Sequence, residues 1–137
     1  MMAKHVIILK SILIMLFLVL GKGQTCAQSV AVDDIEQLQK DMYRLARKSD
    51  SLQQFIEVTN RLIELSKKNN NEDMLYRAWS NQASMLSAEG KREEAMAIVK
   101  EMSDYAREHD SKFGLYTATF TNAQIESGLR MEHQVEK

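Results

Sequence analysis

Apolar and small residues between positions 75 and 106 follow the spacing of two amphipathic helices. The first stripe recurs at intervals that place its members on one face of a helix: Leu75, Ala78, Trp79, Ala83 and Leu86. The second stripe consists of Ala95, Ile98, Val99, Met102 and Ala106. Gly90 lies between them, and glycine readily adopts the left-handed conformation that ends a helix. The pattern therefore predicts two antiparallel helices joined by a tight turn.

The same pattern recurs at an offset of 40 residues, which aligns Leu75, Tyr76, Ala78 and Ala83 with Leu115, Tyr116, Ala118 and Ala123. Further helical stripes precede the central pair. We therefore expect an all-α domain of helical hairpins at about residues 33–68, 73–108 and 113–137. The last hairpin is predicted to be incomplete, with a helix to Ser127, a turn at 128–132 and a short second helix. The apolar face of its first helix would then be uncovered.

The central hairpin resembles the tetratricopeptide repeat. The residues that carry the resemblance stand at the spacing of that family's W-x2-L-G-x2-Y, turn and A-x3-F positions: Trp79, Ala83, Leu86, Gly90, Ala95 and Val99. Gln82, Leu86 and Arg107 depart from the family's Leu, Tyr and Pro. The resemblance implies a right-handed α-α superhelix, a solenoid whose stacked hairpins share one core. Its 40-residue unit is longer than the standard repeat of that family.

The amino-terminal residues 1–27 are predicted to be a signal peptide. Lys4 and Lys10 precede or flank an apolar run over residues 12–20, and Thr25-Cys26-Ala27 forms a small-x-small site for cleavage after Ala27. One alternative is an uncleaved membrane anchor, although spanning a bilayer takes about 20 apolar residues. Another is a lipoprotein in which Cys26 becomes the first residue. The favoured interpretation is export, most simply to the periplasm, with membrane contact only through an uncleaved signal.

Cleavage would change the charge of the chain. Residues 1–27 hold three of the 18 Lys and Arg residues and none of the 19 Asp and Glu residues, so residues 28–137 have a net charge of −4. This balance gives no basic field for nucleic acid. The single cysteine would leave with the signal, so no disulfide is expected despite export.

Candidate chemistry is scarce. His5, His109 and His133 lack partners at metal-ligand spacing, and no phosphate-binding loop or nucleophile motif occurs. The acidic pairs at residues 33–34 and 93–94 fit the first turns of helices, where capping and the helix dipole explain them. We therefore expect no enzymatic activity, no cofactor and no metal.

The resemblance also implies a binding groove, because the first helix of each hairpin lines the concave face in tetratricopeptide proteins. Five of the positions carried over are basic and none is acidic, which would suit an acidic or carboxylate-ended peptide. The alternative is that the basic residues of the first helix are a solvated surface. Trp79 and Tyr76 are expected in the hairpin core. The candidate partner-binding residues are Gln37, Lys40, Arg44, Arg47, Lys48, Arg77, Ser80, Ser84, Thr117, Phe120 and Gln124.

Two functional hypotheses follow. The first is an exported helical-repeat module that binds a protein or peptide, since a signal followed by long helical repeats resembles the periplasmic input region of bacterial membrane-bound sensor kinases and related regulators of signal transduction. The second is a structural scaffold that forms a homo-oligomer, or docks an envelope partner, through the open last repeat. A third alternative is a truncated remnant of a longer protein.

Overall fold

The computed structural model describes residues 34–135, with side chains placed for residues 34–128. The chain divides into two compact units, Met1–Glu36 and Gln37–Lys137, and the packing below lies within the second. The signal peptide expected at residues 1–27 lies outside the described residues and stays a prediction. In the described part of the chain, no helix combines the length and the apolar content needed to cross a bilayer.

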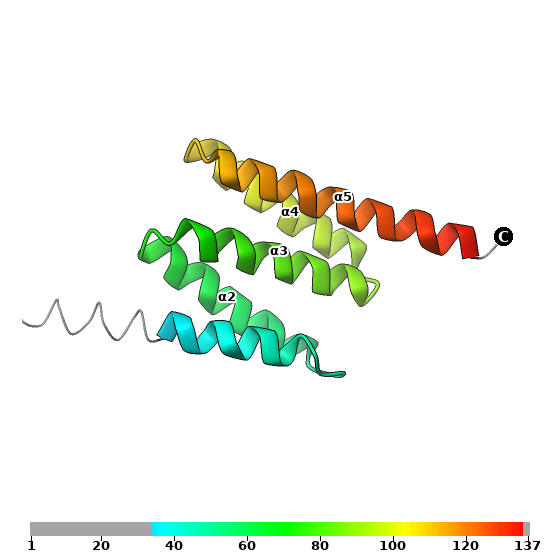
Figure 1. The fold of residues 1–137 in the computed structure, drawn as a ribbon, viewed down its shortest axis with the longest axis horizontal. Coiled ribbons are helices and arrows are strands. Elements are labelled where there is room, and N and C mark those ends of the chain that lie inside the picture. The colour runs from blue at the N-terminus through cyan, green and yellow to red at the C-terminus, as the bar shows by residue number, and fades with distance from the viewer. Residues whose placement is uncertain (1–33, 136–137) are drawn as a thin grey trace, which may run out of the picture. The chain divides into compact units, whose positions relative to one another are not determined.

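The described chain is helical throughout, which confirms the all-α prediction (Figure 1). A first helix covers residues 34–45. It is followed by α2 (Leu52–Lys68), α3 (Glu72–Ala88), α4 (Arg92–Glu108) and α5 (Lys112–Val135). No strand occurs between residues 34 and 135. The first four helices match the predicted hairpin ranges 33–68 and 73–108, except that α3 begins one residue earlier, at Glu72.

The connectors between helices repeat one geometry. Four residues spaced 20 positions apart have positive φ angles, namely Asp50 (63°), Asn70 (52°), Gly90 (77°) and Asp110 (51°). After each of the last three, the backbone amide of the next residue donates a hydrogen bond to the carbonyl of the residue five positions before it. One example is the bond from the Lys91 amide to the Leu86 carbonyl, at 2.8 Å. In each of these connectors, the residue that donates this bond directly precedes the first residue of the next helix. Successive hairpins therefore recur every 40 residues, the offset visible in the sequence.

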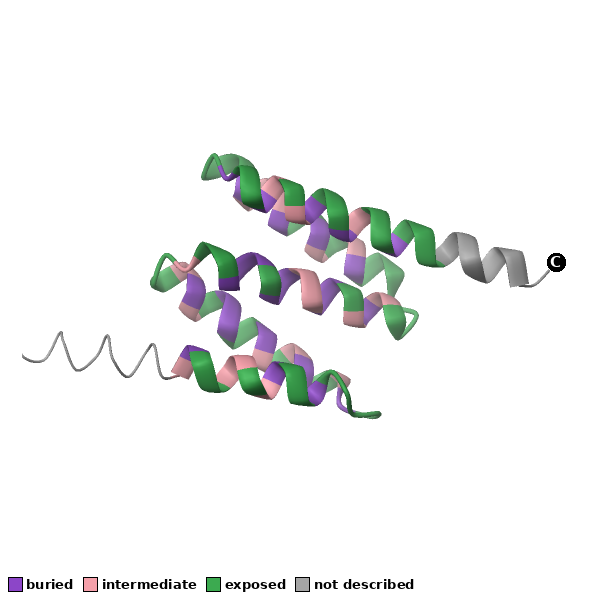
Figure 2. Cartoon of the chain, in the orientation of Figure 1, coloured by how far each residue is buried: buried purple, intermediate pink, exposed green. Residues whose placement is uncertain are grey.

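The core follows this period. Four buried residues of α2 have buried counterparts 40 positions later in α4: Phe55, Thr59, Leu62 and Ser66 correspond to Ala95, Val99, Met102 and Ala106 (Figure 2). The helix α3 lies at the centre, in contact with α2, α4 and α5. Its predicted stripe is buried, and Trp79 and Tyr76 are each only 1% exposed, which confirms that they belong to the core.

The prediction of a turn at residues 128–132 was wrong, because α5 runs as one helix to Val135. The 20-residue spacing of the other connectors places the next one at residue 130, inside the expected turn, but that position holds Arg, which adopts a positive φ less readily than Gly, Asn or Asp, and the φ of Gly128 is not positive. A glycine inside a helix costs only about 1 kcal/mol relative to alanine, so its presence alone does not end the helix. The short second helix expected after this turn is likewise absent as far as Val135.

Gln82, which stands where the tetratricopeptide pattern has Leu, joins α3 to α2 through polar contacts. Its Nε2 donates to Thr59 Oγ1 at 3.0 Å and to Asn60 Oδ1 at 2.8 Å. Thr59 in turn donates to the Phe55 carbonyl at 2.9 Å. The side chain is therefore a buried bridge between two helices where the family pattern has an apolar contact, although its Oε1 has no partner.

Candidate functional site

The predicted partner-binding residues divide into two groups that the structure places differently. Gln37, Lys40 and Arg44 are exposed on the helix at 34–45. Arg47 and Lys48 are exposed too, but they lie in the turn that follows, not on the helix as expected. The helix ends earlier because the chain turns after residue 45, with the Lys48 amide bonded to the Leu45 carbonyl at 3.0 Å.

Acidic neighbours neutralise part of the basic surface. Arg44 pairs with Asp41 at 3.0 Å, and Arg77 pairs with Asp73 at 2.9 Å. The hydrogen bond to Asp73 is the main cause of the raised pKa of Arg77, with a smaller contribution from a hydrogen bond to Tyr43. Such exposed pairs contribute little to stability, but they lower the net positive charge of this face. The sequence-based prediction of a basic groove did not include these two acidic partners, Asp41 and Asp73.

Ser80, expected to face a ligand, instead contacts α5. Its Oγ lies 2.8 Å from Thr121 Oγ1, and Thr121 donates to the Thr117 carbonyl at 2.7 Å. Because the Thr121 proton is used in that bond, Ser80 is the donor to Thr121. The two helices are thus joined by a polar contact, and Ser80 is a packing residue.

The candidates Ser84 and Gln124 come together in a cleft of about 490 Å³. It lies where the end of α3, the start of α4 and the second half of α5 meet, and its other lining residues include Ser87, Arg92 and Ile125. Hydroxyl, amide and guanidinium groups line it together with the apolar Ile125. This combination can hydrogen-bond a peptide backbone and pair with a carboxylate. Sequence reasoning missed Arg92, although its position two residues after Gly90 marks the start of a helix.

The remaining two candidates lie elsewhere on α5. Thr117 is half-buried and donates to the Phe113 carbonyl at 2.8 Å. Phe120 is 51% exposed and stacks on Tyr116, with ring centroids 6.3 Å apart. Neither lines the cleft that contains Ser84 and Gln124. The eleven predicted positions therefore do not form one continuous site.

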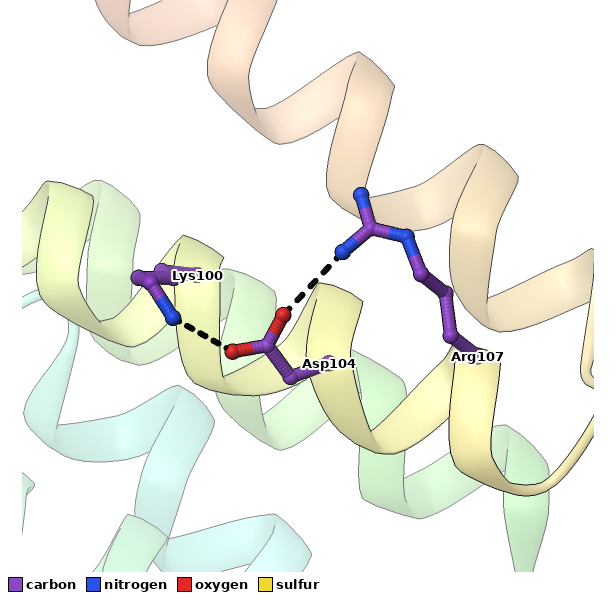
Figure 3. Close-up of polar contacts among 3 residues, drawn as sticks. All are labelled: Lys100, Asp104 and Arg107. Carbon is purple, nitrogen blue, oxygen red and sulfur yellow. Dashed lines mark hydrogen bonds and ion pairs between the residues drawn. The ribbon is translucent and has the colours of Figure 1, made fainter.

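A charged cluster on α4 has a structural explanation. Asp104 binds Lys100 at 2.6 Å and Arg107 at 3.0 Å, both on the same helix (Figure 3). The hydrogen bond from Lys100 is the largest cause of the lowered pKa of Asp104. All three side chains are solvated, and pairs at these spacings stabilise a helix only slightly.

Over the described residues, no group of three or more His, Cys, Asp or Glu side chains is arranged to hold a metal ion. His109 stacks on Tyr105, and its Nδ1 lies 2.9 Å from the Tyr105 carbonyl, so that nitrogen carries the proton. The side chains of His5 and His133 lie outside the described part. Comparison of the chain with models of protein families, with curated proteins and with solved structures found no match.

Proposed function

We propose that this protein is an exported helical-repeat module that binds a protein or peptide segment in the cleft between α3, α4 and α5. The cleft carries the proposal, because it brings Gln124 together with Ser84 and Arg92, which lie at least 32 positions earlier in the sequence. The resemblance to tetratricopeptide repeats supports the same function. In this proposal the module serves as the sensory input of a signal-transduction protein in the periplasm.

The arrangement of the helices supports a curved array. The helix α3 contacts α5, the first helix of the next repeat, whereas the backbones of α2 and α4 do not approach each other. Closer packing on one side bends a stack of hairpins toward that side. In the proposed superhelix, α3 and α5 form the inner, concave face, where tetratricopeptide proteins bind peptides.

Arg92 sets the expected preference for the ligand. It is exposed, and it lies in the first turn of α4, where the helix dipole also favours negative charge. A carboxylate at the end of a peptide or on an acidic side chain would pair with this guanidinium. The acidic preference expected from the basic groove positions thus moves to the cleft, because two of them, Arg44 and Arg77, already have carboxylate partners.

Selection of peptides from a display library, on the purified protein, tests this function. We expect the selected peptides to carry a carboxylate and to bind the Arg92→Gln variant about tenfold more weakly, the equivalent of 1.4 kcal/mol. Lys100→Gln is the matched control, since it removes a cation from the same helix outside the cleft. Failure to enrich any peptide, or equal affinity for the wild type and the Arg92→Gln variant, would contradict the proposal.

A second candidate function rests on the exposed apolar face of α5. Phe113, Tyr116 and Phe120 are 42%, 68% and 51% exposed, whereas Tyr76, which corresponds to Tyr116 one repeat earlier, is buried. Such a face supports a scaffold that self-associates. Sedimentation across a concentration series distinguishes the two functions. A scaffold would dimerise, and Phe120→Ser would restore the monomer; a peptide-binding module would stay monomeric when dilute.

A further inference from the structure

A second cavity, of about 220 Å³, lies at the opposite end of α3 from the cleft. It is bounded by the end of α2, the start of α3 and the end of α4, and its walls include Ser66, Lys67, Glu72, Tyr76 and Tyr105. This volume is smaller than that of most drug-binding pockets, so an occupant would contain few heavy atoms. None of the residues proposed for peptide binding lines it.

Ser66 lines this cavity and carries a buried hydroxyl that no described residue satisfies. The residue is 0% exposed, and its Oγ has no hydrogen-bond partner. The equivalent residue 40 positions later is Ala106, which is also 0% exposed. An alanine therefore meets the packing requirement at this point of the repeat. Because burying an unpaired hydroxyl is unfavourable, a ligand that reached the hydroxyl of Ser66 would supply a hydrogen bond that the described part of the chain does not.

Lys67 has an unusual environment for a half-buried lysine. Its Nζ lies 4.8 Å from the centroid of the Trp79 ring and 4.9 Å from that of Tyr105. The equivalent residue Arg107 pairs with Asp104 three positions before it. Glu64 offers Lys67 the same pairing, yet no ion pair forms between them or between Lys67 and any other described residue. The ammonium is held by aromatic faces at the cavity and retains the capacity to bind an anion.

Glu72 supplies the opposite charge on another wall. Its Oε1 accepts a hydrogen bond from the Ser111 hydroxyl, which also accepts from the Gly114 amide at 2.9 Å. This anchors the carboxylate to the start of α5 and leaves its second oxygen for a ligand. Burial is the largest cause of the raised pKa of Tyr76, so its hydroxyl stays neutral near Glu72. Lys67 and Glu72 thus line one small cavity without pairing with each other.

We propose that this cavity binds a small zwitterion of the α-amino acid class, with its carboxylate on Lys67 and Ser66 and its ammonium on Glu72. The ligand satisfies the Ser66 hydroxyl, gives the Lys67 ammonium an anionic partner and binds the Glu72 oxygen that Ser111 does not use. The side chain of the ligand packs against Leu75 and the ring of Tyr105. The Tyr105 ring is held in place by Trp79 and His109, whose ring centroids lie 5.3 Å and 3.9 Å from its own. The site is separate from the peptide cleft, so this inference does not rest on peptide binding.

Titration calorimetry of the purified protein with each of the common L-amino acids tests the assignment. At least one is expected to bind one-to-one with a Kd below about 1 mM. Its carboxamide lacks the carboxylate, and its N-acetyl form lacks the ammonium, so each should bind at least about tenfold more weakly. Absence of binding by every amino acid, or equal binding of the N-acetyl form, would overturn the proposal.

Variants assign the two charges. Lys67→Met keeps the length of the side chain and should weaken binding at least about tenfold, whereas Arg107→Met, the matched change one repeat later, should leave it unaltered. Glu72→Gln should weaken binding of the free amino acid but not of its N-acetyl form. Because Glu72 is exposed, this second test remains available if Lys67→Met does not fold. Full affinity in the folded variants would show that these charges do not hold the ligand.

Ser66→Ala separates a binding role from a packing role. The change removes the buried hydroxyl that has no partner and leaves the side chain found at Ala106. We expect a higher Tm for the ligand-free protein and weaker binding of the amino acid. A lower Tm with unchanged binding would assign Ser66 to packing and would contradict its place in the site.

Discussion

Replacing Trp79 with alanine is expected to lower the free energy of unfolding by about 3–5 kcal/mol. Trp79 is the largest of the buried side chains and contacts Tyr76, Tyr105 and Lys67, which belong to three different helices. Its removal leaves a cavity at the junction of α2, α3 and α4 that these helices cannot close together. Urea unfolding followed by far-UV circular dichroism measures the change, because the variant lacks the only tryptophan.

Tyr116→Ala is the control for this experiment. It also deletes an aromatic side chain, but one that is 68% exposed on α5. Surface substitutions usually change stability by less than about 0.5 kcal/mol. A loss of similar size in both variants would mean that α5 is covered in solution, and a small loss in Trp79→Ala would contradict the packing described for α3.

Gly114→Ala is expected to destabilise the protein by about 1–3 kcal/mol, although alanine is the better helix former. Gly114 is buried near the start of α5, and a Cβ there would overlap ring carbons of Tyr76 and lie 2.7 Å from its hydroxyl oxygen. Tyr76 is itself 1% exposed, so its ring has little room to move. The midpoint of urea unfolding measures the effect.

The matched control is Gly128→Ala in the same helix. A Cβ at Gly128 would meet no atom within 4 Å, and its φ is not positive. At this position no steric clash opposes the higher helix propensity of alanine, so the substitution should raise the free energy of unfolding by about 0.5–1 kcal/mol. Opposite signs at the two glycines would confirm the close approach of α3 and α5 at Tyr76. Stabilisation by both changes would show that Tyr76 moves aside.

The sequence predicted those features of the fold that depend on one helix at a time. The stripe that includes Trp79 and Leu86 reports which face of α3 is buried, because apolar spacing is a local property of a helix. The turn at Gly90 could be predicted for the same reason, because it depends on the conformation of a single residue. The regular spacing of Asp50, Asn70 and Asp110 was a further signal, since Asn and Asp tolerate the left-handed conformation, whereas the arginine at residue 130, where the next connector would fall, does so less readily.

The candidate site was less predictable because it depends on distances between helices. The sequence could not show that Ser80 meets Thr121, since which faces approach is set by the packing of α3 on α5. Nor could it show that Lys67 turns from Glu64 toward Trp79 and Tyr105. Ser84 and Gln124 were placed in the groove by the repeat pattern, and they do line one cleft, but the sequence gives no measure of its volume or of the approach of Arg92.

The fit of Tyr76 against Gly114 has a consequence for the interchangeability of the repeats. The residue equivalent to Gly114 in the preceding hairpin is Met74, whose side chain would occupy the space taken by the Tyr76 ring. A duplicated copy of residues 71–110, inserted after Asp110, would bring every connector into the correct position and yet set methionine against tyrosine at the new junction. Although the connectors are alike, the central hairpin of this chain cannot be stacked on a second copy of itself without displacing that ring.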